Sequence, residues 1–311
     1  MLNPTIQYLK KNYSLDVYKI SKIKHTDVNS KNFLAVSKNG SYVVHSFANY
    51  KTKRMEQICK ILDFCAKNKA NVSEPILGNN RSFVDSKRRL YVTRFHDGKF
   101  FSIHTQLDDL AKNLAYIHKT LKKIRISLDH DDSQKYYAML TDKEFEVIKN
   151  LSNKKSQTYD RIIYKNIDFL SSITKYLQTS NYNKKYTQLI HSDLHPKNVL
   201  FQNNKLEVIL DFGAMRKGSV IEDIAFSSFR FSLYQKKETK IRLSMKKFLK
   251  NYLTLNKSAI EFTDEEYFLK KIILERINYI LRNRYFYDSN LWVVDIQKHL
   301  AALKLADSIF K

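Results

Sequence analysis

Residues 191–213, HSDLHPKNVLFQNNKLEVILDFG, constrain the fold of this chain more than any other segment. Two short apolar runs, VLF and LEVIL, flank the pair Asn203-Asn204, which is typical of a tight turn between antiparallel strands. The pattern therefore predicts a β-hairpin. Asn198 precedes its first strand and Asp211 follows its second strand, so we expect these two side chains to lie close together at the open end.

The polar residues around this hairpin have the order that magnesium-dependent phosphoryl transfer uses. Asp193 is a carboxylate that can orient the acceptor hydroxyl and receive its proton, and Asn198 follows five residues later with an amide oxygen. Protein kinases use H-R-D-x-x-x-x-N and D-F-G for these tasks, and the chain has H-S-D-x-x-x-x-N and D-F-G. We predict that Asp193 is catalytic, and that Asn198 and Asp211 hold Mg²⁺ and through it ATP.

The segment after D-F-G leaves no room for the long activation segment that docks a peptide, so we expect a small acceptor. The pattern HSDLHPKNVLF…LDFGAMRKGSVIEDIA resembles the aminoglycoside phosphotransferase and choline kinase family, which includes a homoserine kinase branch. The resemblance implies an α+β, two-lobed protein-kinase-like fold and the cofactors ATP and Mg²⁺. It places a small mixed N-terminal β-lobe at residues 1–98 and a larger, mainly helical C-terminal lobe at residues 99–311.

Strand and helix signals along the chain agree with this fold. Asn39-Gly40 is a strong hairpin signal, and Asp97-Gly98 stands where the family has the hinge between its lobes. After the catalytic motif we expect the chain to be almost entirely helical. The predicted strands are 17–24, 33–38, 41–47 and 90–95, and the predicted helices are 4–13, 51–68, 107–122, 142–151 and 165–177.

Other polar residues near the motif receive supporting roles. His191 is expected to brace the catalytic loop, and His118 to be a packed histidine. Asp223 matches the aspartate that heads a helix in the family, where it would secure the loop through backbone N–H groups. Glu222 and Arg230 are weaker candidates for the acceptor pocket, because their helix follows the catalytic strand.

The residues expected to bind the nucleotide phosphates depart from the family pattern. Where the family has Lys or Arg to hold the phosphates, this chain has His45, and Glu56 on the next helix is its candidate partner. The loop at residues 25–31, which would cover the phosphates, contains no glycine. We predict that a carboxylate neighbour keeps His45 protonated. The alternative is that His45 only packs, and that a cation of the following helix reaches the phosphates: Lys51, Lys53 or Arg54.

The chain is strongly basic, with 55 Lys and Arg against 31 Asp and Glu and a net charge of +24. Three explanations remain open: drift from an AT-rich coding sequence, attraction of anionic substrates, or nucleic-acid binding. The lysines are spread through every segment rather than clustered, which favours drift, so no nucleic-acid partner is expected. No long apolar run or signal-peptide core is present, so a cytoplasmic location without membrane insertion is expected. Cys59 and Cys65 are expected to be buried thiols.

The sequence favours a phosphotransferase with an alcohol group as acceptor, acting on a small hydroxylated metabolite. Homoserine, an amino alcohol such as choline, a sugar and an aminoglycoside all fit the motif. Two alternatives remain open: a kinase of a surface polysaccharide or lipid headgroup, and a catalytically silent kinase fold that serves as a binding module. The oligomeric state cannot be predicted from the sequence.

Overall fold

The computed structural model describes residues 5–23, 31–47, 51–102, 106–129, 137–155, 157–180, 187–257, 260–290 and 292–311. The chain divides into two compact units. The first comprises Met1–His130, Gln188–Val220 and Lys250–Lys257, and the second comprises Asp131–Thr187, Ile221–Leu249 and Ser258–Lys311. The catalytic hairpin thus groups with the N-terminal sheet. The lobe boundary after residue 98 stays a prediction.

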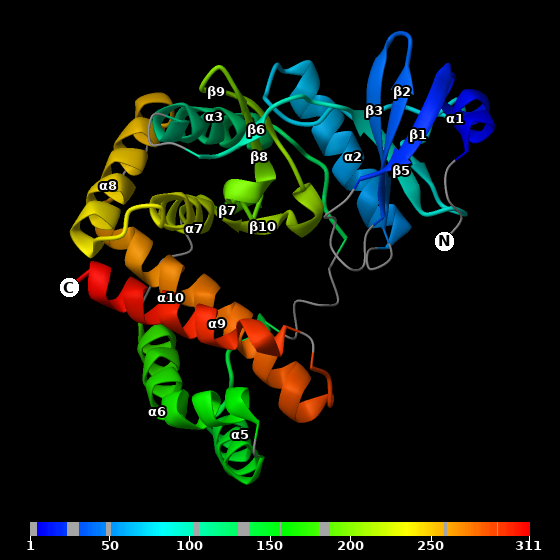
Figure 1. The fold of residues 1–311 in the computed structure, drawn as a ribbon. Coiled ribbons are helices and arrows are strands. Elements are labelled where there is room, and N and C mark those ends of the chain that lie inside the picture. Colours follow the sequence, from blue (N-terminus) through cyan, green and yellow to red (C-terminus); the bar gives the residue numbers. More distant parts are fainter. Residues whose placement is uncertain are drawn as a thin grey trace. The chain divides into compact units, whose positions relative to one another are not determined.

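An antiparallel five-stranded sheet forms the N-terminal part of the first unit (Figure 1). Its strands are β1 (Val17–Lys22), β2 (Asn32–Ser37), β3 (Gly40–Ser46), β4 (Val84–Asp85) and β5 (Leu90–Arg94), in the order β1-β2-β3-β5-β4. Ser37 pairs with Gly40 across the predicted hairpin. Gly40 has a φ of 130°, a conformation that a residue with a side chain rarely adopts. The strands predicted on both sides of this turn are confirmed.

One face of this sheet is buried beneath α1 (Ile6–Tyr13), the predicted lead-in helix, which lies beside β1 in Figure 1. Alternation along β3 directs Tyr42 and Val44 into this core and leaves Val43 and His45 half-buried on the other face. The core also contains aromatic and aliphatic side chains from the helix and the neighbouring strands: Tyr8, Leu9, Tyr13, Leu15, Val17, Phe33, Ala35, Leu90 and Val92.

Two amphipathic helices, α2 (Thr52–Lys67) and α3 (Gln106–Leu121), complete the framework of the first unit. Cys59 and Cys65 are free and buried on α2, as predicted, and burial raises the pKa of the Cys65 thiol to about 12. His118 of α3 is buried, and its Nδ1 shares a hydrogen bond of 2.9 Å with the Tyr252 hydroxyl. The interpretation of His118 as a packed histidine is confirmed.

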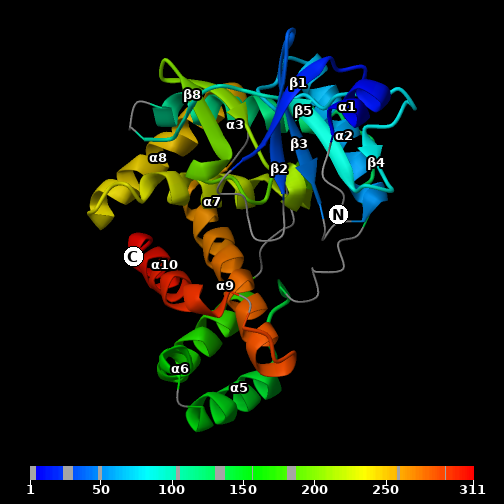
Figure 2. The ribbon, with the colours of Figure 1, turned by 45° about the vertical axis from the view of Figure 1, so that its right-hand side comes forward.

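The second unit is helical. It contains α5 (Asp142–Lys154), α6 (Thr158–Thr179), most of α7 (Val220–Ser232) and α8 (Glu238–Leu255), α9 (Phe262–Phe286) and α10 (Ile296–Ile309). Figures 1 and 2 show α10 running alongside the long α9. Asp160 of α6 is fully buried and accepts hydrogen bonds from Arg284 Nη2 at 3.0 Å and from the Tyr285 hydroxyl at 2.7 Å. This network attaches α6 to α9.

Glu265 of α9 gives the second unit a pH-dependent stability. Burial raises the pKa of its carboxyl from 4.5 to about 8, although a hydrogen bond from Ser228 opposes the shift. The folded protein therefore binds a proton that the unfolded chain releases between these pH values. Its contribution to the free energy of unfolding is complete below pH 4.5, and it falls by about 1.4 kcal/mol per pH unit until pH 8.

We expect Glu265→Gln, which carries no titrating proton, to lose this pH dependence. Chemical unfolding at pH 5, 6, 7 and 8 checks the prediction. At each step the free energy of unfolding of the wild type should fall relative to that of the variant. Glu146→Gln removes an exposed glutamate of α5 and is the control. Parallel pH curves for wild type and Glu265→Gln would contradict a protonated Glu265.

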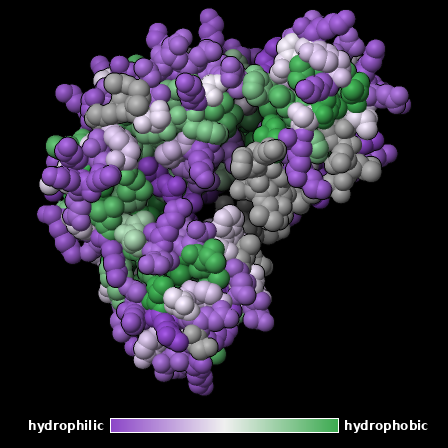
Figure 3. Space-filling view, viewed as in Figure 1, coloured by the Kyte–Doolittle hydropathy of each residue, from purple (hydrophilic) through white to green (hydrophobic). Residues whose placement is uncertain are grey.

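Hydrophilic residues cover most of the face visible in Figure 3, with smaller hydrophobic patches between them. They are spread over the surfaces of both units rather than gathered in one place. Among the helices of the described ranges, none is long and apolar enough to cross a membrane.

Candidate active site

The predicted catalytic hairpin is present in the first unit as β8 (Val199–Gln202) and β9 (Lys205–Ile209). Asn203 and Asn204 form its turn with φ values of 50° and 61°, which asparagine tolerates better than most residues. At the open end, the Leu210 amide donates to the Asn198 carbonyl oxygen at 2.8 Å. Asn198 and the residue before Asp211 are therefore hydrogen-bonded neighbours, and the hairpin prediction is confirmed.

A short strand, β6 (Lys99–Phe100), pairs with β8 and directly follows Asp97 and Gly98. A Cβ atom at Gly98 would lie 3.1 Å from both Leu200 Cβ and the Phe201 carbonyl oxygen. Gly98 therefore permits the close approach that adds this strand to the catalytic hairpin.

His191 connects the catalytic loop to the hairpin. Its Nε2 lies 2.8 Å from the Leu210 carbonyl oxygen, and its Nδ1 accepts a hydrogen bond from the Asp193 amide at 3.2 Å. A carbonyl oxygen can only accept, so Nε2 is the donor in the first of these contacts. The buried ring also packs on Phe212 of the D-F-G sequence, with centroids 4.5 Å apart. These contacts give His191 a positioning geometry, because both nitrogens face groups of the protein.

A hydrogen bond to the loop orients the side chain of Asn198. Its Nδ2 donates to the Asp193 carbonyl oxygen at 2.9 Å, which fixes the side chain. Asp211 is exposed, and its Oδ1 accepts a longer contact of 3.3 Å from the Gly213 amide. Asp211 has a φ of 55° and Ser192 a φ of 69°, so the backbone is strained on both sides of the site.

These oxygen donors fit a magnesium ion. Mg²⁺ is usually bound by one or two carboxylates together with substrate phosphates and water, and Asn198 and Asp211 supply an amide oxygen and a carboxylate. Within the described ranges, no group of three or more His, Cys, Asp or Glu residues could hold a metal by itself. Asn198 and Asp211 are the residues that would hold the ion.

The structure gives Arg54 a role that the sequence did not predict. Arg54 of α2 is buried and donates to the carbonyl oxygens of Asp129, at 2.7 Å, and of Met215, in the segment after D-F-G. Both terminal nitrogens of its guanidinium therefore support that segment, and the alternative that Arg54 anchors the phosphates stays a prediction. Lys53 pairs with Asp129 at 3.2 Å. The missed signal is that Arg54 lies four residues before the buried Ile58, on the apolar stripe of the helix.

A second contact holds the loop ahead of Asp193. Arg216 Nε donates to the Ser192 hydroxyl at 2.9 Å. Arg216 begins β10 (Arg216–Ser219), which pairs with β7 (Thr187–Ile190), the strand that leads into the catalytic loop. The segment before the hairpin and the segment after it are therefore connected to each other, by the pairing of β7 with β10 and by the bond between Arg216 and Ser192.

The predicted ion pair between His45 and Glu56 is wrong. Glu56 Oε2 accepts hydrogen bonds from the Ser82 hydroxyl and from the backbone amides of residues 83 and 84, at 2.8–3.0 Å. His45 instead shares a hydrogen bond of 2.9 Å with the Thr93 hydroxyl and stacks on Tyr91 with centroids 4.5 Å apart. Three donors from a distant loop therefore hold the carboxylate. The roles of His45 and Glu56 in nucleotide binding stay predictions, and residues 25–30 of the covering loop lie outside the described ranges.

We expect His45 to take up a proton when Mg·ATP binds. Burial lowers the pKa of the free imidazole from 6.5 to about 4, so the ring is neutral at pH 7. Phosphate charges close to the ring would raise that pKa above 7 and cause uptake of about one proton. Calorimetry at pH 7 in buffers of different ionisation enthalpy measures this number, and His45→Gln should abolish the uptake. Equal uptake by both proteins, or none by either, would remove His45 as the cationic phosphate anchor.

The residues predicted on the helix after D-F-G have different environments. Glu222 and Asp223 are buried in the first turn of α7. Glu222 forms an ion pair of 3.1 Å with Lys271, and Lys271 also pairs with Glu275. Arg230 is half-buried and lines a cavity in the second unit. Glu222 does not line that cavity. A substrate role for Glu222 and a loop-securing role for Asp223 stay predictions.

The model of a family described as the phosphotransferase enzyme family matches residues 22–241, more than half of the chain. The chain therefore belongs to the phosphotransferase enzyme family. A search of curated proteins found no significant match.

Solved structures share the fold over nearly their whole length. An aminoglycoside phosphotransferase from Alicyclobacillus acidocaldarius has 14% identity, a TM-score of 0.72 and coverage of 100% of this chain and 96% of its own. Amicoumacin kinase in complex with AMP-PNP and Ca²⁺ has 14% identity, a TM-score of 0.66 and coverage of 98% and 92%. Choline kinase from Streptococcus pneumoniae has 15% identity, a TM-score of 0.60 and coverage of 97% of each chain. The predicted family resemblance and kinase-like α+β fold are confirmed.

Proposed function

We propose that this phosphotransferase is an ATP- and Mg²⁺-dependent kinase that transfers the γ-phosphate to a hydroxyl of a small metabolite. The acceptor classes are an amino alcohol, a homoserine-like compound, a sugar or an aminoglycoside. The observation that carries the proposal is how three motif residues are held. Asn198 and Asp211 lie at the open end of one hairpin, and hydrogen bonds to His191 and Asn198 fix the backbone of Asp193. The AMP-PNP and Ca²⁺ in the amicoumacin kinase structure support a nucleotide and a divalent cation here.

In the proposed mechanism, Asp193 accepts a hydrogen bond from the acceptor hydroxyl and aligns its oxygen with the γ-phosphorus. As the new P–O bond forms, the bond between the γ-phosphorus and the bridging oxygen breaks and ADP leaves, and the carboxylate takes the proton that the hydroxyl loses. His191 fixes the Asp193 amide and therefore the position of this carboxylate. Mg²⁺ bound by Asn198 and Asp211 would offset negative charge on the ATP phosphates.

The complete set of three motif residues favours catalysis over a silent binding module. A surface polysaccharide or lipid headgroup is the alternative acceptor, and its hydroxyl would meet the same carboxylate. A cytoplasmic location is part of the proposal, because that compartment supplies ATP.

The proposal is tested by ADP formation from ATP with a panel of acceptors, in the presence and absence of Mg²⁺. The panel contains homoserine, choline, ethanolamine, simple sugars and aminoglycosides. We expect one class to raise ADP formation well above the rate with ATP alone, and only when Mg²⁺ is present. A rate that depends on neither Mg²⁺ nor any acceptor would support the silent binding module.

A further inference from the structure

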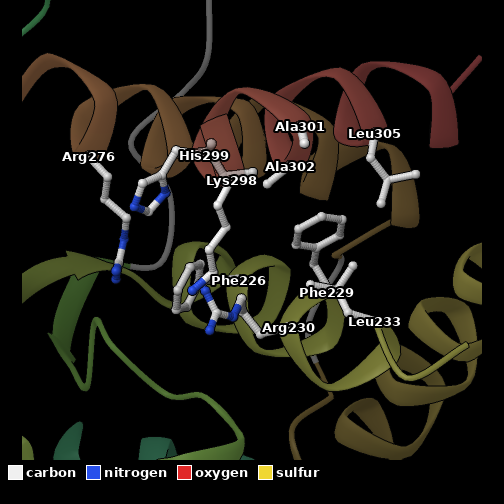
Figure 4. Close-up of a pocket in the computed structure, with 11 residues that line it drawn as sticks. Phe226, Phe229, Arg230, Leu233, Arg276, Lys298, His299, Ala301, Ala302 and Leu305 are labelled. Atoms are coloured by element: carbon white, nitrogen blue, oxygen red, sulfur yellow. The ribbon is translucent and has the colours of Figure 1, made fainter. Parts of the chain in front are cut away.

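A cavity of about 260 Å³ lies entirely within the second unit, between helices α7, α9 and α10 (Figure 4). Its walls are therefore fixed by the packing of that unit. The volume is slightly below the range of about 300–1,000 Å³ that is typical of ligand pockets, so it suits a small metabolite. The lining residues are Phe226, Phe229, Arg230 and Leu233 of α7 and the following turn, Ile273 and Arg276 of α9, and Lys298, His299, Ala301, Ala302 and Leu305 of α10.

The lining is basic at one end and apolar at the other. Figure 4 shows Lys298 extending from α10 toward α7, with Arg230, Arg276 and His299 in the same part of the cavity. Phe229, Leu233, Ala301 and Leu305 form the remaining wall. The lining thus combines three basic side chains with an apolar surface, and it includes no aspartate or glutamate.

Phe226 holds two of these cations near each other. The guanidinium of Arg276 lies 4.4 Å from the Phe226 ring centroid, and that of Arg230 lies 5.6 Å from the same centroid. Cation–π contacts of this kind limit the freedom of both side chains. Three cationic side chains around a small volume create a positive potential there, which favours an anionic ligand.

The ionisation of His299 reports the sign of the local field. Burial and, after it, the charges of Arg276, Lys298 and Arg230 lower the pKa of its imidazole to about 4, whereas Asp295 opposes the shift. His299 therefore stays neutral at pH 7 and can act as a hydrogen-bond partner.

We infer that this cavity binds a small organic anion, a carboxylate or phosphate joined to a short apolar carbon chain. The anionic group would be held by Arg230, Arg276 and Lys298, and the carbon chain would contact Phe229 and the α10 alanines. The same field disfavours cationic ligands such as choline or ethanolamine. The anion could be the phosphate acceptor itself or a separate effector, and both share this chemistry.

Four probes with the same five-carbon chain test the inference: pentanoate, pentyl phosphate, pentan-1-ol and pentylammonium. Their affinities are measured by ligand-observed NMR titration of the full chain without nucleotide. We expect the two anions to bind, and to bind about tenfold or more tightly than the alcohol and the ammonium, as charge-assisted hydrogen bonds imply. Equal affinity for all four head groups, or tighter binding of the ammonium, would overturn the inference.

Two lysines of α10 provide a matched pair of variants. Lys298 lines the cavity, whereas Lys304 lies near Phe169 and is not among the lining residues, and both are exposed. Lys298→Met should weaken pentanoate binding by about fivefold or more, and Lys304→Met should leave it within about twofold. Arg230→Gln repeats the test from another helix. Equal losses in the two lysine variants would contradict the assigned site.

A hydroxylated probe, 5-hydroxypentanoate, distinguishes the two sources of the ligand. Its phosphorylation by ATP, reduced in Lys298→Met, would identify the anion as the acceptor. Binding without phosphorylation, again reduced in Lys298→Met, would identify an effector. This binding requires no turnover, so a failure of the proposed kinase function leaves it intact, and a failure to bind leaves the kinase function intact.

Discussion

Asp193→Asn is expected to lower the turnover number by about 10²–10⁴-fold, the usual contribution of a general base. The amide has the same shape as the carboxylate but cannot take the acceptor proton. The hydrogen bonds that involve the backbone of Asp193, from its amide to His191 and from Asn198 to its carbonyl oxygen, do not require the side chain. We therefore expect the affinity for Mg·ATP, measured by calorimetry, to stay within about twofold of the wild type.

The control for this variant is Asp16→Asn, which makes the same replacement at an exposed ion pair with Lys10. It should leave both turnover and nucleotide affinity unchanged. Residual activity of Asp193→Asn within threefold of the wild type would contradict the role of Asp193 as base. A large loss of Mg·ATP affinity would instead place Asp193 at the metal.

Asp211→Asn is expected to lower the Mg·ATP affinity by about 10–150-fold, the effect of losing a charged hydrogen-bonding or ligand contact of 1.5–3 kcal/mol. Asparagine is the suitable replacement because residue 211 has a φ of 55°, which asparagine tolerates better than alanine. Asp211→Ala should lose at least as much. Calorimetric titration with ATP in the presence and in the absence of Mg²⁺ separates the contribution of the metal.

The metal-free titration is the internal control for Asp211. Without Mg²⁺, wild type and Asp211→Asn should bind ATP with similar affinity, or the variant slightly more tightly, because one negative charge has been removed. An unchanged Mg·ATP affinity in the variant would rule out Asp211 as a metal ligand.

The parts of the site that could be predicted from the sequence are local in the chain. The catalytic hairpin has its turn residues Asn203-Asn204 between two apolar runs, and the two-residue turn determines the pairing of Gln202 with Lys205. A bulge between Leu200 and Phe201 then shifts the register, and the sequence pattern did not predict it. The first sheet is equally readable around Asn39-Gly40. In both cases the residues that determine the structure lie within about ten positions of one another, so the local sequence pattern is enough to predict the strands and the turn.

The parts that could not be predicted depend on contacts between distant segments. Glu56 is held by donors from residues 82–84, and no local pattern distinguishes these from His45 as its partner. Arg54 reaches a carbonyl 161 positions away. The basic cavity arises where three helices meet, and its lining positions are separated by up to some 80 residues. Which helix faces meet is decided by packing, which the sequence pattern of a single helix does not specify.

Phosphorus NMR of the complete reaction tests the central claim most directly, because it observes the fate of the γ-phosphate. Wild-type protein is incubated with ATP, Mg²⁺ and the acceptor that most strongly raises ADP formation. We predict that a phosphomonoester signal grows in step with ADP, and that it is absent without Mg²⁺ and strongly reduced in Asp193→Asn. Release of inorganic phosphate alone, or equal phosphomonoester formation by Asp193→Asn, would contradict transfer to a hydroxyl aligned by Asp193.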